Sequence, residues 1–207
     1  MSNFKSDLQK ETLLAAYLDA VYFRKNIDFK RVTNLSQQLQ GIDLVIMHKA
    51  DTYYIDEKAQ LHYLNKNLPT FTFELSYLKK GQRKTGWLFD EQKLTHYYFL
   101  VTGIYLKGKK SKLKYSKDIE RLKITSVNRG KLVKHLNSIG LTKEKLNTFD
   151  SILRKGNKYG KKYISELNPK SEGLLYYSKH LREKPINLQL RLSYLIENKI
   201  AKKFHYT

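Results

Sequence analysis

Two short apolar segments separated by a polar one constrain this 207-residue chain more than any other feature. Residues 42–47 are apolar apart from Asp43, and residues 53–55 are aromatic or β-branched. The intervening residues 48–52 have the length and polarity of a hairpin connection. We therefore predict an antiparallel β-hairpin whose turn is centred near residues 49–50.

The residues before the hairpin predict a helix. Ser6–Gln9 fits a capping box, because Gln stands three residues after Ser. Apolar residues then recur at helical spacing to about Phe23, and Glu11 lies within this helix. A polar segment, residues 26–41, connects the helix to the hairpin.

Downstream of the hairpin the patterns alternate between strand and helix. Strands are expected at residues 70–76, 97–106, 119–127 and 173–178. Helices are expected at residues 128–139, 142–154 and 187–203. Asn128 and Thr142 would cap the first two of these helices, and Gly140 would separate them.

A single α/β domain covering residues 1–207 is the most economical interpretation. Its core would comprise about 6–127 plus 173–207, as a mixed sheet flanked by helices. Residues 128–160 would form a C-terminal helical insertion. A separate domain starting near residue 128 is the alternative.

Composition excludes several classes of protein. No run approaches 18 apolar residues, which excludes a membrane-spanning helix, and no secretory signal is expected. The chain has no cysteine, which excludes disulfides, thiolate zinc sites and cysteine nucleophiles, so we expect a cytoplasmic protein. The six histidines lack zinc-site spacing, and neither a Gly-x-Ser-x-Gly elbow nor a P-loop occurs.

The excess of positive charge is large and uneven. Lys and Arg number 40 against 19 Asp and Glu, a net charge of +21. Residues 1–78 carry nine basic and nine acidic side chains. Residues 79–117 carry eleven basic and two acidic side chains, and residues 118–207 carry twenty basic and eight acidic ones. A neutral N-terminal third followed by a basic remainder indicates acidic chemistry beside a surface that binds a polyanion. The alternative is solvation by lysine, since 32 of the basic residues are Lys.

Nucleic acid is the polyanion that such a surface would bind. Three basic segments, residues 79–84, 107–117 and 155–162, are predicted to be loops and are expected to contact phosphates without sequence preference. The candidate contacts in the first two segments are Lys79, Lys80, Arg83, Lys84, Lys107, Lys109, Lys110 and Lys112.

The hairpin carries the residues with the clearest chemistry. Asp43 stands near the start of the first strand and Asp56 near the end of the second, with Lys58 two positions on. Antiparallel pairing sets Asp43 opposite Asp56, and opposed side chains have Cβ atoms about 4.5–5.5 Å apart. Strand alternation puts Asp56 and Lys58 on one face and Glu57 on the other. Two carboxylates this close repel each other unless a proton or a cation lies between them.

Paired carboxylates beside a lysine are what metal-assisted phosphodiester hydrolysis requires. Asp43 and Asp56 are hard oxygen ligands suited to Mg²⁺, with Mn²⁺ as a substitute. Lys58 would orient or deprotonate the attacking water. The non-catalytic alternative is that Asp43 is a strand-edge or turn residue and that Asp56 and Lys58 form a surface ion pair.

The same residues carry a family resemblance. Gly41-Ile42-Asp43 followed by apolar residues, and then an apolar strand ending in Asp56-x-Lys58, resembles the PD-(D/E)xK superfamily of restriction-endonuclease-like nucleases. The resemblance covers about residues 6–100. It implies a restriction-endonuclease-like fold and a further metal-binding Glu on the N-terminal helix, which would be Glu11. Gln60, expected on the face of Lys58, matches a Gln that follows the lysine in some members and completes the catalytic candidates.

The chain also departs from the family pattern. Ile42 stands where the family has proline, and residues 78–94, where a helix is expected between two strands, are poorly helical. Glu11 is explained equally well as a helix-surface residue. Glu74 interrupts an aromatic strand and is expected to face solvent or substrate rather than a metal. Three further polar residues either line the site or belong to a polar loop: Lys30, Arg31 and Gln37.

The sequence therefore predicts a Mg²⁺-dependent phosphodiesterase or endonuclease acting on DNA rather than RNA. Two alternatives stay open at this point: a non-catalytic nucleic-acid-binding protein on the same fold, and an RNA-directed nuclease. Nucleic acid is the expected partner, and a homodimer is left open.

Overall fold

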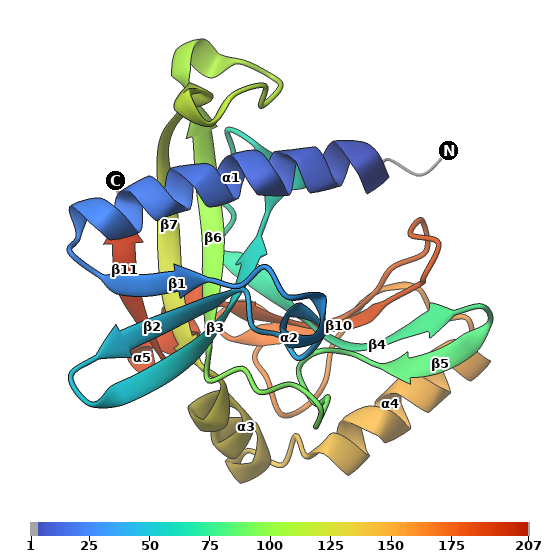
Figure 1. Cartoon of the computed structure of the whole chain (residues 1–207). Helices are drawn as coiled ribbons and strands as arrows, with labels where there is room; N and C mark the ends of the chain where they lie inside the picture. The colour runs from blue at the N-terminus through green and yellow to red at the C-terminus, as the bar shows by residue number, and fades with distance from the viewer. Residues whose placement is uncertain (1–3, 207) are drawn as a thin grey trace. The chain divides into compact units, whose positions relative to one another are not determined.

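The computed structural model describes residues 4–206, except for the side chains of residues 4–6 and 109. Within these residues the chain is a mixed α/β protein with two sheets and five α-helices (Figure 1). Its contacts divide it into two compact units. Unit 1 comprises residues 1–68, 95–127 and 202–207, and unit 2 comprises residues 69–94 and 128–201.

Unit 1 is built on a six-stranded mixed sheet. Its order is β1-β2-β3-β6-β7-β11. The strands are β1 (Asp28–Arg31), β2 (Leu44–His48), β3 (Asp51–Ala59), β6 (Tyr97–Leu106), β7 (Ile119–Asn128) and β11 (Ala201–Tyr206). The predicted hairpin is confirmed as antiparallel β2–β3, with Leu44 opposite Ile55 and His48 opposite Asp51. β3 then pairs in parallel with β6, which makes the sheet mixed.

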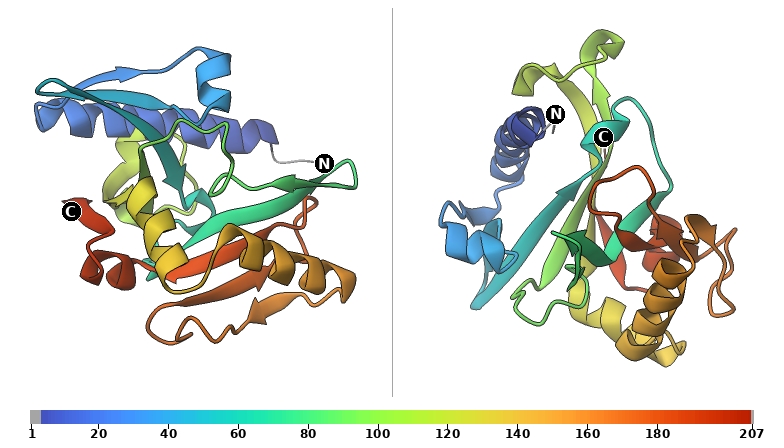
Figure 2. Two further views of the ribbon diagram at one scale, coloured as in Figure 1. Left: turned by 90° about the horizontal axis from the view of Figure 1, so that it is seen from below. Right: turned by 90° about the vertical axis from the view of Figure 1, so that its right-hand side faces the viewer.

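One long helix covers a face of this sheet. α1 (Phe4–Arg24) lies across the strands in Figures 1 and 2. It buries Leu14, Leu18, Val21 and Tyr22, each at most 4% exposed, against Leu44, Ile55, Phe99 and their neighbours. The buried positions recur every three or four residues, which is the spacing of one helix face. Burial of each such side chain stabilises the unit by about 1.5–3 kcal/mol.

Unit 2 is built on a five-stranded antiparallel sheet with order β5-β4-β10-β9-β8. The strands are β4 (Thr70–Lys79), β5 (Gln82–Thr85), β8 (Gly160–Lys162), β9 (Gly173–Tyr177) and β10 (Ile186–Arg191). Three helices accompany them: α3 (Arg129–Ser138), α4 (Lys143–Lys155) and α5 (Leu192–Glu197). The remaining helix, α2 (Leu35–Leu39), belongs to unit 1. The prediction of a single domain with an insertion stays a prediction.

The local predictions for α3 and α4 are confirmed. Asn128 accepts a hydrogen bond from Lys131 N at 2.8 Å, and Thr142 accepts one from Lys145 N at 3.3 Å. Both caps satisfy backbone donors that a helix leaves free in its first turn. Between the helices, Gly140 adopts a positive φ of 80°, which glycine tolerates best.

The predicted helix at residues 187–203 is wrong. The segment instead contains most of β10, all of the six-residue α5 and part of β11. Ile186, Leu188 and Leu190 are fully buried while the residues between them are half-buried. Burial of every second residue is typical of a strand. The leucines that follow this stretch made the whole segment resemble a helix.

Four smaller expectations also change. The helix begins at Phe4, before the proposed capping box at Ser6–Gln9. The strand at residues 70–76 exists as β4, but it belongs to the second sheet. Residues 79–84 form the β4–β5 hairpin rather than a loop, with positive φ at Lys80 and Gly81 that suits a two-residue turn. Residues 160–162 form β8 inside the predicted basic loop 155–162.

Candidate active site

Asp43 lies directly before β2, whose first residue, Leu44, stands opposite Ile55 of β3. The backbone N–H of Asp43 donates to Ile55 O at 2.9 Å. Its side-chain Oδ2 accepts a hydrogen bond from Glu57 N, also at 2.9 Å. The carboxylate of Asp43 is therefore fixed against the neighbouring strand.

Asp56 is buried beside two charged side chains. Its exposed fraction is 2%, and its Oδ1 lies 2.6 Å from Lys58 Nζ. A hydrogen bond also links Asp56 to Asp43. Burial raises the pKa of Asp56 from 3.8 to about 7, the positive charge of Lys58 opposes this rise, and the negative charge of Asp43 adds to it. The pair has the electrostatics of two carboxylates that hold either a proton or a cation between them.

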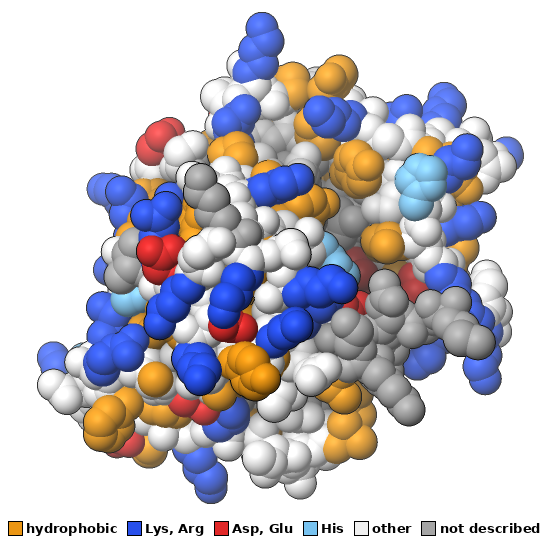
Figure 3. Space-filling view, turned by 90° about the horizontal axis from the view of Figure 1, so that it is seen from above, with side chains coloured by type: hydrophobic (Ala, Val, Ile, Leu, Met, Phe, Trp, Pro, Cys, Tyr) orange, Lys and Arg blue, Asp and Glu red, His pale blue; other side chains and the backbone are white. Residues whose placement is uncertain are grey.

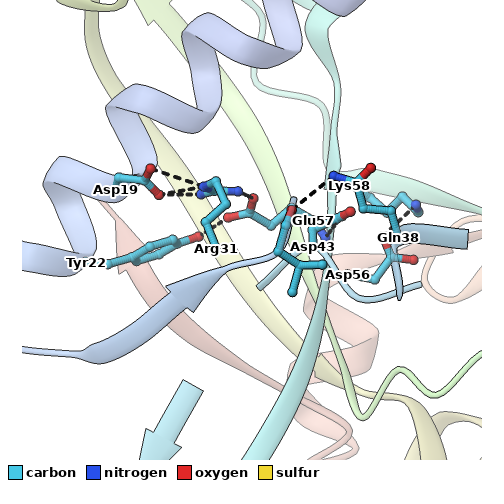
Figure 4. Close-up of polar contacts among 9 residues, drawn as sticks. Asp19, Tyr22, Arg31, Gln38, Asp43, Asp56, Glu57 and Lys58 are labelled. Atoms are coloured by element: carbon cyan, nitrogen blue, oxygen red, sulfur yellow. Dashed lines mark hydrogen bonds and ion pairs between the residues drawn. The ribbon is translucent and has the colours of Figure 1, made fainter. Parts of the chain in front are cut away.

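Glu57 points to the opposite face of β3, as strand alternation predicts. Its carboxylate accepts hydrogen bonds from Tyr22 Oη at 2.5 Å and from Arg31 Nη1 at 2.7 Å (Figure 4). Arg31 Nε in turn donates to Asp19 at 2.8 Å. Tyr22 and Asp19 come from α1 and Arg31 from β1, so this network ties both elements to the strand that carries Asp56.

Glu11 faces the site from α1. A cavity of about 260 Å³ between α1 and the sheet is lined by Glu11, Arg31, Gln38, Asp43 and Glu57 among its polar residues. Burial raises the pKa of Glu11, while the positive charge of Lys58 lowers it and the negative charge of Asp43 raises it. Glu11 is thus close enough to Asp43 and Lys58 to feel both charges, although Asp56 and Lys58 are not among the residues that line the cavity.

The carboxylates of Asp43 and Asp56 suit a hard divalent cation, but they are only two. Within residues 4–206, no group of three or more His, Asp and Glu side chains has the arrangement of a metal site. Mg²⁺ needs only one or two carboxylates when waters and substrate phosphates complete its octahedral shell. Asp43 and Asp56 supply such a pair, and a cation between them would remove the repulsion from Asp43 that adds to the effect of burial on the pKa of Asp56.

The remaining catalytic candidates lie in different settings. Gln60 follows the last residue of β3, so strand alternation no longer fixes its face; its backbone N donates to Val101 O at 3.0 Å. Glu74 is half-buried on β4 of unit 2. Lys30 and Gln37 are exposed. Only Arg31 among the polar-loop candidates joins the network around the cavity.

Sequence reasoning missed Asp19 and Tyr22. Asp19 stands eight residues after Glu11, and positions separated by seven or eight residues share a helix face. That spacing could have identified Asp19 as a second acidic residue facing the sheet. Tyr22 carries no comparable signal, because its burial within an apolar helix face is explained by the core alone.

The basic candidates with described side chains are all exposed, but two of them also pair with acidic residues. Lys79, Lys80, Lys84, Lys107 and Lys112 are exposed. Arg83 is exposed as well but donates to Asp150 at 3.0 Å and to Asn147 at 2.6 Å, and Lys110 lies 2.6 Å from Asp118. The side chain of Lys109 lies outside the described part of the structure. On the face in Figure 3, Lys and Arg side chains are far more evident than Asp and Glu.

Comparisons with protein-family models, with curated proteins and with solved structures give no match. None of the helices in residues 4–206 is long and apolar enough to span a membrane.

Proposed function

We propose that this chain is a metal-dependent nuclease that hydrolyses phosphodiester bonds in DNA. The observation that carries the proposal is the convergence of Asp43, Asp56 and Lys58 at one end of the β2–β3 hairpin. A net charge of +21 supplies long-range attraction for a polyanion to this acidic centre. Without positive charge around them, the two carboxylates would repel a phosphate.

Each residue has a distinct role in this proposal. Asp43 and Asp56 would hold Mg²⁺, and Mg²⁺ would supply Lewis-acid chemistry at the scissile phosphate. Lys58 is anchored by Asp56 but remains one-third exposed, so it can orient water or contact a phosphate oxygen. Glu11 lines the same cavity as Asp43, so its carboxylate can accept a hydrogen bond from a water that enters there.

We also propose a restriction-endonuclease-like fold for unit 1. The support is a helix bearing Glu11, an antiparallel hairpin bearing Asp43 and Asp56-x-Lys58, and a following parallel strand in one mixed sheet. The connection from β3 to β6 departs from the pattern. It contains no α-helix and includes the β4–β5 hairpin of the second sheet.

One observation favours a second candidate, a non-catalytic nucleic-acid-binding protein. In the described residues the candidate metal site has only two carboxylates, those of Asp43 and Asp56, and Lys58 already forms an ion pair with Asp56. An ion pair of this kind can be purely structural. In that case nucleic acid would bind through the basic surface, and no divalent cation would be needed.

The deciding experiment compares the wild-type protein, Asp56→Asn and the control Asp28→Asn. Asp28 is an exposed residue on β1, so its substitution changes the net charge equally without touching the carboxylate pair. Each protein is incubated with linear, circular and branched DNA and with RNA in Mg²⁺, Mn²⁺ or Ca²⁺. We expect Mg²⁺- and Mn²⁺-dependent DNA cleavage by the wild type and the control, little cleavage in Ca²⁺, and none by Asp56→Asn.

The other outcomes separate the alternatives. Binding without cleavage in any metal supports the binding protein, and cleavage of RNA alone supports an RNA-directed nuclease. Full cleavage by Asp56→Asn shows that the site is assigned wrongly.

A further inference from the structure

A short uncharged segment, exposed from residue 33 to residue 39, leads directly into the candidate active site. Residues 32–42 contain no Asp, Glu, Lys, Arg or His, although 29% of the chain is charged. The segment includes α2, of which no residue is buried. Leu35 is 68% exposed and Leu39 is 66% exposed, and they are four residues apart on one side of the helix. Figure 2 shows α2 at the surface of unit 1.

The ends of α2 are held firmly despite this exposure. Asn34 caps the helix by accepting a hydrogen bond from Gln37 N at 3.2 Å. At the other end, Gly41 N donates to Gln38 O at 2.9 Å and Ile42 N donates to Gln37 O at 3.1 Å. This pair of bonds, with a φ of 74° at Gly41, is a Schellman ending. α2 is therefore a helix with hydrogen-bonded caps at both ends rather than an irregular loop.

The same ending places α2 beside the carboxylates. Asp43 follows Ile42 immediately, and Gly41 O accepts a hydrogen bond from the buried Thr95 Oγ1 at 2.7 Å. The side chain of Gln38 donates to Val32 O at 3.0 Å and lines the cavity that Glu11 and Asp43 also line. α2 therefore contributes Gln38 to the cavity that Asp43 lines, and Leu39 precedes Asp43 by four residues.

The chemistry of the segment matches bases rather than phosphates. Phosphate contacts come mainly from Lys and Arg, and residues 32–42 have none. Leucine side chains act in DNA-binding proteins as wedges between base steps. Leu35 and Leu39 have this chemistry, and they lie together on one exposed side of α2.

We propose that α2 contacts the bases of duplex DNA next to the phosphodiester held at Asp43 and Asp56. Leu35 and Leu39 press into the base stack. This inference rests on the proposed nuclease function, and it assigns to α2 the contacts that set where that site cuts. The charge distribution fits this division, because the basic segments elsewhere supply the phosphate contacts.

Base unstacking gives a direct test that does not depend on cleavage. Asp56→Asn protein is bound to duplexes carrying 2-aminopurine at successive positions around the cut site mapped with the wild type. We expect the fluorescence to rise several-fold at one or two adjacent positions. The rise should disappear when Leu35→Ser and Leu39→Ser are added, while Ile152→Ser, an exposed helical residue on α4, leaves it intact. Circular dichroism and the thermal midpoint check that each variant is folded.

The remaining outcomes overturn the inference. If Asp56→Asn binds the duplex and the wild type cuts it, but no position shows a rise that requires the two leucines, the inference fails and the nuclease stands. If sedimentation shows a dimer that the leucine substitutions convert to monomer, with base fluorescence unchanged, α2 forms an interface between copies instead. If the wild type neither binds nor cuts DNA, the proposed function fails as well.

Discussion

Asp56→Asn should stabilise the metal-free protein at neutral and alkaline pH, although it removes the proposed metal ligand. Asp56 is 2% exposed, and burial raises its pKa in the folded state from 3.8 to about 7. Between these values the folded protein binds a proton that the unfolded chain has lost. Stability contributed by this group is therefore fully present below pH 3.8 and is lost as the pH rises towards 7.

The magnitude follows from the size of the shift. Each unit of pKa difference corresponds to 1.36 kcal/mol, so the full penalty for ionising Asp56 is roughly 4 kcal/mol above pH 7. Asparagine avoids this penalty, which already includes the opposing attraction of Lys58. The gain should be roughly 4 kcal/mol at pH 8, or about 8–16 °C in the thermal midpoint of a chain of this size.

The assay is thermal unfolding of the wild type, Asp56→Asn and the control Asp28→Asn in EDTA, at pH values from 4 to 8. The two variants should have equal midpoints near pH 4 and diverge as the pH rises. Addition of Mg²⁺ should then raise the midpoint of the wild type but leave that of Asp56→Asn unchanged, because a bound cation replaces the proton. An Asp56→Asn midpoint below that of the wild type at pH 8 in EDTA would refute the reasoning. So would a difference between them that does not vary with pH.

Four further predictions concern separate parts of the molecule. Lys58→Ala should lower the single-turnover cleavage rate more than it weakens Mg²⁺ binding in a metal titration, because the ammonium acts on water or phosphate and not on the cation. Arg31→Met should cost about 2 kcal/mol in chemical denaturation, since it leaves Glu57 and Asp19 without their shared cation; Arg31→Lys should cost less. Replacing Lys107 and Lys112 by Glu should weaken binding to unrelated DNA sequences equally and flatten the salt dependence in filter binding; unchanged affinity would mean that this segment is only solvated. Asn128→Ala should lower stability by about 1 kcal/mol in the same denaturation assay, whereas Asn128→Asp should have little effect because either side chain can accept the bond from Lys131 N.

Local chemistry determined the parts of this protein that the sequence alone predicts. The β2–β3 register follows from two apolar segments and a short connection, and it is enough to bring Asp43 beside Asp56 and to put Glu57 on the other face. The ends of α3 and α4 follow from Asn128 and Thr142, whose side chains reach backbone donors three residues away. In each case the interacting groups lie close together in the sequence, so a pattern of residue types specifies the geometry.

Tertiary structure decided what depends on distant segments. β4 has the pattern of a strand, but only its pairing with β10, more than a hundred residues later, places it in the second sheet. The segment 187–203 has apolar residues compatible with a helix, and pairing with β4 and β9 makes its first part a strand instead. The perturbed pKa of Asp56 and the Tyr22–Glu57–Arg31–Asp19 network also require α1, β1 and β3 to be packed together. Desolvation and long-range pairing are properties of the folded chain, because the type of a residue does not specify which distant segment will cover that residue.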